Sequence, residues 1–195
     1  MYKTLAKKHF LSQGWKLKGA ELVSHRRCVV IAAPHTSNWD LLYTLIAFEL
    51  LGLPVRFTVK KVWMQFPQGI FMRQLGGIGI DRSPKDGSTE RKSMVQAMIE
   101  LFEETEGDLA ITVTPEGTRS LRTQWKSGFY HVAVGAGVPI LLGFLDYEKK
   151  EVGVGKVIHP SGNFEADMVE ITDFYKDIAP KHPELFSVDQ RFLKE

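Results

Sequence analysis

The chain has 195 residues, of which 44% are hydrophobic and 25% charged, a balance typical of a globular protein with one buried core. Its net charge of +2 is too small to favour nucleic acid as a partner, so we expect none. A single cysteine, Cys28, excludes an intramolecular disulfide and a cysteine-based metal site, which favours a reducing compartment. We therefore expect a single domain over residues 1–195 with no metal and no other cofactor.

The first segment, residues 1–26, is basic and contains one acidic residue, Glu21. A helix over residues 2–10 would place its lysines on one face and Tyr2, Leu5 and Phe10 on another, with Trp15 close behind. Such a helix suits an anionic membrane surface, and an amphipathic helix packed on the domain is an equally good interpretation. Since the chain has neither a secretory signal nor a run of about 18 apolar residues, we expect a cytoplasmic protein peripheral to the inner face of the cell membrane.

Short apolar or β-branched segments bounded by glycine, proline or charged residues predict strands. These segments are residues 15–18, 27–33, 55–60, 77–81, 109–114, 139–146 and 152–159. Apolar residues at helical spacing predict helices over residues 40–51 and 88–104, the second capped by Ser88 or Thr89. A third helical face near the end is formed by Met168, Ile171, Tyr175 and Ile178.

This alternation favours a single α/β domain with a largely parallel, twisted sheet flanked by helices, in which the last two strands form an antiparallel pair. Polar clusters follow three of the predicted strands: "PHTSNWD" after residues 27–33, "DRS" after 77–81 and "PEGTRS" after 109–114. Ligands of open α/β sheets bind beyond the carboxyl ends of the strands. We therefore expect these clusters to form one site.

His35 and Asp40 in the first cluster are candidates for acid–base chemistry. A neutral imidazole can accept a proton from an attacking hydroxyl, and a carboxylate on its other nitrogen orients the ring and stabilises the imidazolium. Four intervening residues across a strand-to-helix turn allow Asp40 to fold back onto His35. The alternative is that Asp40 caps the following helix and His35 is an ordinary turn residue.

Two arginines at predicted strand ends, Arg82 and Arg119, are candidates for binding phosphate, because a guanidinium offers a planar fork of donors. Thr118 adds a hydroxyl beside Arg119, in a tight turn that contains Gly117. The alternative is that both arginines form ion pairs with acidic neighbours, Arg82 with Asp81 or Asp86 and Arg119 with Glu116.

The chain contains four short blocks, "HTSNWD", "GGIGIDR", "TPEGTRS" and "GVPI", whose order and rough spacing match the four motif blocks of one protein family. In them the chain resembles the glycerophospholipid acyltransferase family, which includes the lysophosphatidic acid acyltransferases. The resemblance covers roughly residues 28–145, so residues 27–145 would form the core that carries the four blocks. It implies a glycerol-3-phosphate acyltransferase-like fold and a catalytic histidine and aspartate separated by four residues.

The resemblance implies a role for each matching residue. His35 would be the base that deprotonates the acceptor hydroxyl, with Asp40 as its orienting partner and Ser37 as a hydrogen-bonding support. Lys60 matches a lysine that is common in the family. The acceptor's glycerol phosphate would be bound by Arg82, Glu116, Gly117 and Arg119 of the second and third blocks. The acyl-donor side would be formed by Val138, Pro139 and Ile140 of the fourth block.

The reaction implied by the resemblance is a direct attack of the acceptor hydroxyl on an acyl thioester of coenzyme A or acyl carrier protein, as in phospholipid biosynthesis. The acceptor would be a lysophospholipid such as 1-acyl-glycerol-3-phosphate. Thr114 and Gly79 depart from the residues usual at their positions in the family, and the chain lacks the long hydrophobic N-terminal helices of many members. The alternatives are a non-phosphate lipid acceptor, a non-catalytic lipid- or phosphate-binding module, and a metal-dependent hydrolase with His35 and Asp40 as ligands.

Overall fold

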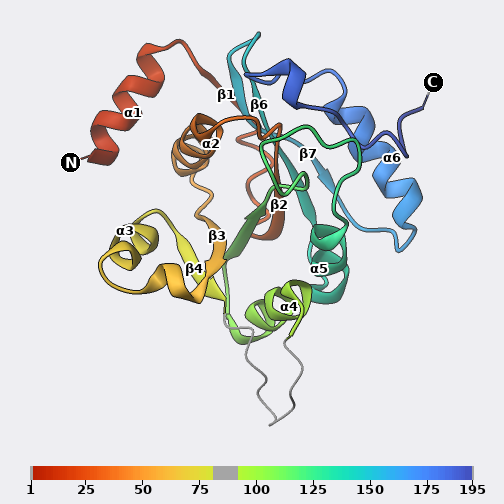
Figure 1. The fold of residues 1–195 in the computed structure, drawn as a ribbon, viewed down its shortest axis with the longest axis horizontal. Coiled ribbons are helices and arrows are strands. Elements are labelled where there is room, and N and C mark those ends of the chain that lie inside the picture. The colour runs from red at the N-terminus through yellow and green to blue at the C-terminus, as the bar shows by residue number, and fades with distance from the viewer. Residues whose placement is uncertain (1, 81–91, 195) are drawn as a thin grey trace.

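The computed structural model describes residues 2–80 and 92–194, without the side chains of residues 2–6, 60, 62, 63 and 68. Its centre is a seven-stranded sheet with the strand order β1-β7-β6-β2-β5-β3-β4 (Figure 1). The strands are β1 (Lys16–Lys18), β2 (Arg27–Ala33), β3 (Val55–Lys60), β4 (Gly77–Ile80), β5 (Leu109–Val113), β6 (Ile140–Asp146) and β7 (Glu151–Ile158).

The directions of the strands confirm the predicted mixed sheet. The five strands from β6 to β4 run parallel to one another. The predicted antiparallel pair is β6 and β7, and β1 pairs parallel with β7, so the first strand also runs against the central five. All the predicted strands are present, with bounds that differ by at most one residue.

Helices connect the strands and cover both faces of the sheet. They are α1 (Tyr2–Ser12), α2 (Asn38–Leu50), α3 (Gln68–Gln74), α4 (Met94–Glu104), α5 (Gly128–Ala136) and α6 (Phe164–Tyr175), with short 3₁₀ helices η1 (Lys61–Met64) and η2 (Pro183–Leu185). The helices α1, α2, α4 and α6 were expected from their apolar spacing. The helices α3 and α5 were not, because both are short and contain glycine, and α5 is apolar almost all round.

The start of α4 corrects the predicted helix over residues 88–104. The proposed caps, Ser88 and Thr89, lie outside the described residues. The helix begins at Met94, because Ser93 has extended backbone angles and its hydroxyl accepts a hydrogen bond of 3.0 Å from the N–H of Gln96. At the other end of the chain, Ile178 lies beyond the end of α6, although it still packs on the core.

Alternate residues of β2 face opposite sides of the sheet, as the pleat of a strand requires. Val29 and Ile31 belong to the core cluster that contains side chains of α4, α5 and α6. Cys28 and Val30 belong to the cluster on the other face, with Phe48 of α2. Cys28 is fully buried, and burial raises the pKa of its thiol to about 12, so it acts as a small apolar core residue.

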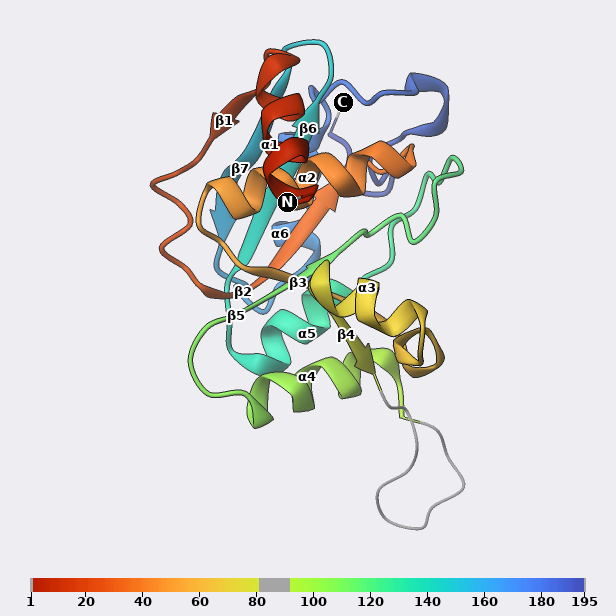
Figure 2. The same ribbon diagram turned by 90° about the vertical axis from the view of Figure 1, so that its left-hand side faces the viewer.

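The helix α1 lies beside α2 (Figure 2) and is held there by aromatic packing. Phe10 is fully buried, with its ring centroid 5.9 Å from that of Trp15 and 5.7 Å from that of Tyr43. Lys7 forms an ion pair of 3.1 Å with Glu49 of α2. Phe10 and Trp15, two of the aromatic residues that the membrane interpretation places against lipid, are therefore inside the protein. None of the described helices combines the length and apolar character needed to cross a bilayer.

Candidate active site

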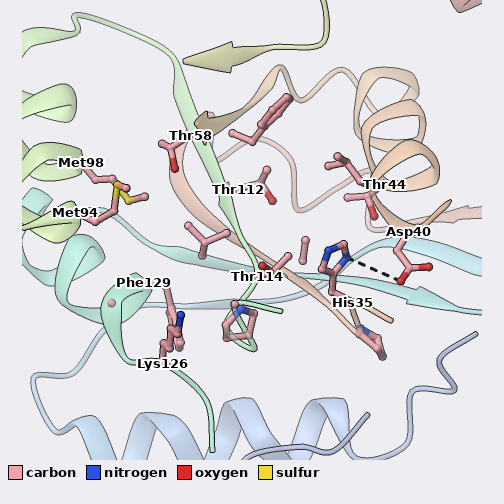
Figure 3. Close-up of a pocket in the computed structure, with 18 of the residues that line it drawn as sticks. His35, Asp40, Thr44, Thr58, Met94, Met98, Thr112, Thr114, Lys126 and Phe129 are labelled. Carbon is pink, nitrogen blue, oxygen red and sulfur yellow. Dashed lines mark ion pairs between the residues drawn. The ribbon is translucent and has the colours of Figure 1, made fainter. Parts of the chain in front are cut away.

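A cavity of about 640 Å³ lies at the carboxyl ends of β2, β3 and β5, between α2 on one side and α4 and α5 on the other. Figure 3 shows His35 and Asp40 on one side of this cavity and Met94 and Met98 on the opposite side. Its position agrees with the general rule for open α/β sheets. Residues of the first and third sequence blocks meet here, as predicted.

His35 and Asp40 face each other at the junction of β2 and α2. The Nδ1 atom of His35 lies 3.9 Å from Oδ2 of Asp40, an ion-pair distance rather than a hydrogen bond. The same Oδ2 atom accepts hydrogen bonds from the N–H groups of Thr36 at 2.6 Å and Ser37 at 2.7 Å. Asp40 therefore caps α2 and also faces His35, so the two interpretations that the sequence left open both hold.

Ser37 and Tyr147 complete the surroundings of the Asp40 carboxylate. The Ser37 hydroxyl accepts a hydrogen bond from the N–H of Trp39 at 3.0 Å and donates one to Oδ1 of Asp40 at 3.2 Å. The Tyr147 hydroxyl donates to the same Oδ1 at 2.7 Å. Burial and this bond raise the pKa of Tyr147 above its usual range, so the phenol stays protonated and remains a donor. These donors hold a carboxylate that is only 3% exposed in one position.

The imidazole of His35 is disposed to be neutral. Burial lowers its pKa below the ordinary value of 6.5, Asp40 partly opposes this shift, and the positive charge of Arg119 adds to it. Because Asp40 lies beside Nδ1, the other ring nitrogen, Nε2, is the one left to accept a proton. The arrangement is that of a general base with an orienting carboxylate.

Glu116 links the third block to the first. Its Oε1 atom accepts a hydrogen bond of 2.9 Å from the backbone N–H of His35, across 81 residues of sequence. Its Oε2 atom is buried, with no hydrogen-bond partner among the described residues. Burial raises the pKa of the carboxyl group to about 7, although the backbone N–H bonds oppose the shift. These contacts indicate that Glu116 holds His35 in position. Contact of Glu116 with the acceptor stays a prediction.

Gly117 and Lys126 bring a positive charge to the cavity. Gly117 has a φ of 65°, and a Cβ atom there would lie 2.6 Å from Nζ of Lys126, so the side chain of Lys126 crosses directly over the turn. Lys126 lines the cavity (Figure 3) and was not predicted from the sequence. Its position after Trp125, in a loop that precedes an unpredicted helix, carries no motif that would have pointed to it.

The arginine of the third block is not among the described residues that line the cavity. The Arg119 guanidinium donates a hydrogen bond to the side-chain oxygen of Asn38 at the start of α2. The alternative ion pair with Glu116 is not among the ion pairs of the described residues. The Thr118 hydroxyl accepts a bond of 3.3 Å from the N–H of Ser120. Arg119 thus lies close enough to His35 to contribute to the lowered pKa of its imidazole. Binding of phosphate by Arg119 stays a prediction.

The remaining predicted site residues are not among the described residues that line the cavity. Arg82 is outside the described residues, and Lys60 is the last residue of β3, with its side chain outside them. Ile140 pairs with Val29 near the start of β2, whereas His35 follows the end of that strand. The fourth block, residues 138–140, therefore lies toward the amino ends of the parallel strands, opposite to the cavity, which it does not line.

The far side of the cavity is apolar. It is lined by Met94, Val95 and Met98 of α4 and by Phe129 of α5. Between the two sides stands Thr112, whose buried hydroxyl has no hydrogen-bond partner among the described residues. A polar side with an acid–base pair and an apolar side opposite suit a ligand that joins a reactive polar group to a hydrocarbon chain.

The histidines at 131 and 159 lie outside this cavity. His131 stacks on Phe164, and His159 contacts His25 edge-on. The described part of the chain has no group of three or more histidine, cysteine, aspartate or glutamate side chains that could hold a metal ion.

Comparison with known proteins gives the family and the fold of the chain. A family model described as Acyltransferase matches residues 14–141. The chain is similar to a crystal structure of the 1-acyl-sn-glycerophosphate (LPA) acyltransferase PlsC from Thermotoga maritima, with a TM-score of 0.51 and 20% sequence identity over 82% of this chain and 68% of that chain. At this identity the likeness shows a shared fold. No curated protein matches the chain.

Proposed function

The chain belongs to the acyltransferase family, and we propose that it moves a fatty acyl group from an acyl thioester to the hydroxyl of a lysophospholipid. The observation that carries the proposal is the pairing of His35 with Asp40 at one side of a cavity whose other side is apolar. The donor would be acyl-coenzyme A or acyl carrier protein, and the acceptor a 1-acyl-glycerol-3-phosphate or a related lipid. The product would then serve phospholipid biosynthesis.

The reaction begins when Nε2 of His35 accepts the proton of the acceptor hydroxyl. Asp40 stabilises the imidazolium that forms, and the oxygen attacks the thioester carbonyl. Negative charge then develops on the carbonyl oxygen, and Lys126 is the one lysine or arginine among the described residues that line the cavity. When the carbon–sulfur bond breaks, the imidazolium returns its proton to the leaving thiolate, which yields an ester and a free thiol without an acyl-enzyme.

The hydrocarbon chain of the substrate would lie on the apolar side of the cavity. Met94, Val95 and Met98 offer flexible and branched side chains there, and Phe129 closes the wall between them and Lys126. Burial of each methylene contributes about 0.8 kcal/mol, so such a wall favours long acyl chains over short ones. The nature of both substrates favours an enzyme that works at the inner face of the cell membrane.

The test is the release of free thiol from palmitoyl-coenzyme A and from palmitoyl carrier protein, with and without lysophosphatidate, followed by identification of the lipid product by mass. Thiol release that requires the acceptor, together with phosphatidate as product, is the expected result. Release without any dependence on acceptor would indicate a thioesterase. Tight lipid binding with no turnover of either donor would support a non-catalytic module.

The same assay separates phosphate from non-phosphate acceptors. If Arg119 contacts the acceptor's phosphate, Arg119→Ala should raise the KM for lysophosphatidate and leave the KM for an uncharged monoacylglycerol unchanged. Equal KM values for the two acceptors in the wild-type protein would favour a non-phosphate lipid as the natural acceptor. Activity in the presence of a chelator would exclude the metal-dependent hydrolase.

A further inference from the structure

The segment between β3 and β4 exposes large apolar side chains to solvent. Phe66, just before α3, is 84% exposed, and Ile70 and Phe71 of α3 are 51% and 53% exposed. We refer to these three residues as the α3 patch. Exposed apolar residues that occur singly need no explanation, but a cluster on one short segment indicates an interaction surface.

The segment of sequence that contains the α3 patch carries positive charge only. Residues 50–80 contain Arg56, Lys60, Lys61 and Arg73 and no acidic residue. Lys61 and Arg73, which flank the patch in sequence, are both exposed. By contrast, residues 93–108 contain five acidic residues and no basic one, so the positive charge of the β3–β4 segment is a local feature. A partner that is both anionic and apolar complements this surface.

The same face of the protein continues onto α1 and α2. Figure 2 shows α1, α2 and α3 facing the viewer together. A hollow of about 260 Å³ lies among them, lined by Lys7 of α1, by Leu42, Leu45 and Ile46 of α2 and by the end of α3. The one acidic residue in this lining, Glu49, is paired with Lys7. The face that surrounds the α3 patch is thus apolar and basic over several elements.

We propose that the α3 patch inserts into an anionic lipid bilayer and docks the enzyme there. A bilayer is favoured over a protein partner because the Phe66 side chain projects into solvent over most of its surface. A protein partner would have to supply a pocket that matches this side chain, whereas a bilayer is a fluid apolar phase that the side chain can enter directly. Phe10 of α1 is fully buried and so is not available to insert into a bilayer. Since η1 and α3 follow the carboxyl end of β3, docking brings the edge of the sheet that holds the cavity close to the lipid.

This inference deepens the membrane association included in the proposed function, and its main test requires no turnover. Cys28, the only cysteine, is fully buried, so a Phe66→Cys variant can be labelled selectively with an environment-sensitive dye. The matched control is Leu193→Cys, since Leu193 is a large apolar residue with 45% exposure in the C-terminal segment. Vesicles of phosphatidylcholine alone and of equal parts phosphatidylcholine and phosphatidylglycerol are the probes.

We expect the fluorescence emission of the dye at position 66 to shift to shorter wavelength with the anionic vesicles and to shift less with the neutral ones. The emission of the dye at position 193 should not shift with either kind of vesicle. The shift should decline as salt is added, because exposed charges are screened. No shift at position 66, or equal shifts at both positions, would overturn the proposal. A shift with acyl carrier protein but not with vesicles would also overturn it, in favour of a protein partner.

A second variant links docking to activity. Phe66→Ser combined with Phe71→Ser should lower partition onto the anionic vesicles by about tenfold or more, because burial of each aromatic side chain contributes strongly to transfer from water. The control is Val134→Ser combined with Leu193→Ser, which removes apolar residues of similar exposure from α5 and the C-terminal segment. Equal partition of the two double variants would overturn the proposal.

Turnover distinguishes this inference from the proposed reaction. The Phe66→Ser, Phe71→Ser variant should lose activity on an acceptor embedded in vesicles and keep it on a short-chain acceptor dissolved as monomers. If the wild-type protein transfers no acyl group to either acceptor, the proposed reaction fails while the dye measurement still decides whether the patch inserts. An equal loss of activity on both acceptors would overturn the docking role.

Discussion

The polar side of the cavity combines one turn, which holds His35 and Asp40, with residues far away in the sequence, whereas its apolar side comes from the two neighbouring helices α4 and α5. Asp40 is held by donors from its own turn and by Tyr147, which lies 107 residues away. Met94, Met98 and Phe129 are held by packing against the sheet and each other. The acid–base chemistry therefore depends on a hydrogen-bond network, while the fit of the acyl chain depends on side-chain volume. Substitutions on one side should therefore leave the property of the other side unchanged.

The largest effect is expected for His35→Ala. Loss of the general base should lower kcat by about 10²–10⁴, measured as acceptor-dependent thiol release, with the fold intact by circular dichroism. His159→Ala is the matched control, since His159 lies outside the cavity and should be dispensable. Because the pKa of His35 lies below 6.5, wild-type activity should hold through neutral pH and fall only at lower pH, as the imidazole becomes protonated. Full activity of His35→Ala would refute the assignment of the base.

Lys126→Met tests the positive charge in the cavity. If the ammonium faces the charge that develops on the thioester carbonyl, its loss should lower kcat by about 10²–10³ without changing acyl-chain preference. Lys156→Met, which removes an exposed lysine paired with Glu170, is the control. A rise in the KM of the donor with unchanged kcat would instead indicate that Lys126 binds a phosphate of the donor.

Glu116→Gln tests the buried carboxyl group through stability. The pKa of Glu116 in the folded protein is about 7, above the ordinary value of 4.5, so the folded state holds this proton more tightly than the unfolded state. The free energy of unfolding of the wild type should therefore fall as pH rises between those two values, by roughly 3 kcal/mol relative to Glu116→Gln, whose side chain is neutral throughout. Urea unfolding of both proteins across this pH range measures the difference, and parallel curves would contradict the raised pKa.

The smallest effect is expected on the apolar side. Met94→Phe should shift acyl preference toward shorter chains and Met94→Ala toward longer ones, each by about tenfold in relative kcat/KM, because a methylene in an apolar pocket is worth only about 1–3 kcal/mol. Competition between thioesters of different chain lengths measures the shift. Because one substitution enlarges the side chain of this partly buried residue and the other shortens it, each variant serves as the control for the other. A fall in kcat at every chain length, with no change of preference, would show that the two sides are not separable.

Much of the polar side could be predicted from a short stretch of sequence. A strand that ends at Ala33 and a helix that starts at Asn38 leave a turn of four residues, and this local geometry brings Asp40 back to His35. The capping role of Asp40 follows from the same spacing. Tyr147, by contrast, reaches Asp40 only because β6 lies beside β2 in the sheet. No spacing in the sequence encodes that contact.

The sequence by itself determined the strands, the parallel core with an antiparallel pair formed by the last two strands, and the position of the acid–base pair, because these depend on hydrophobic periodicity and on local turns. Only the tertiary structure decided the rest. It placed Lys126 over Gly117, turned Glu116 inward to His35, and placed the fourth block at the opposite ends of the strands from the cavity. It also buried Phe10 and left Phe66 in solvent. Those outcomes depend on which segments pack together across the fold, and the burial of a side chain is a property of its neighbours in space rather than of its own sequence.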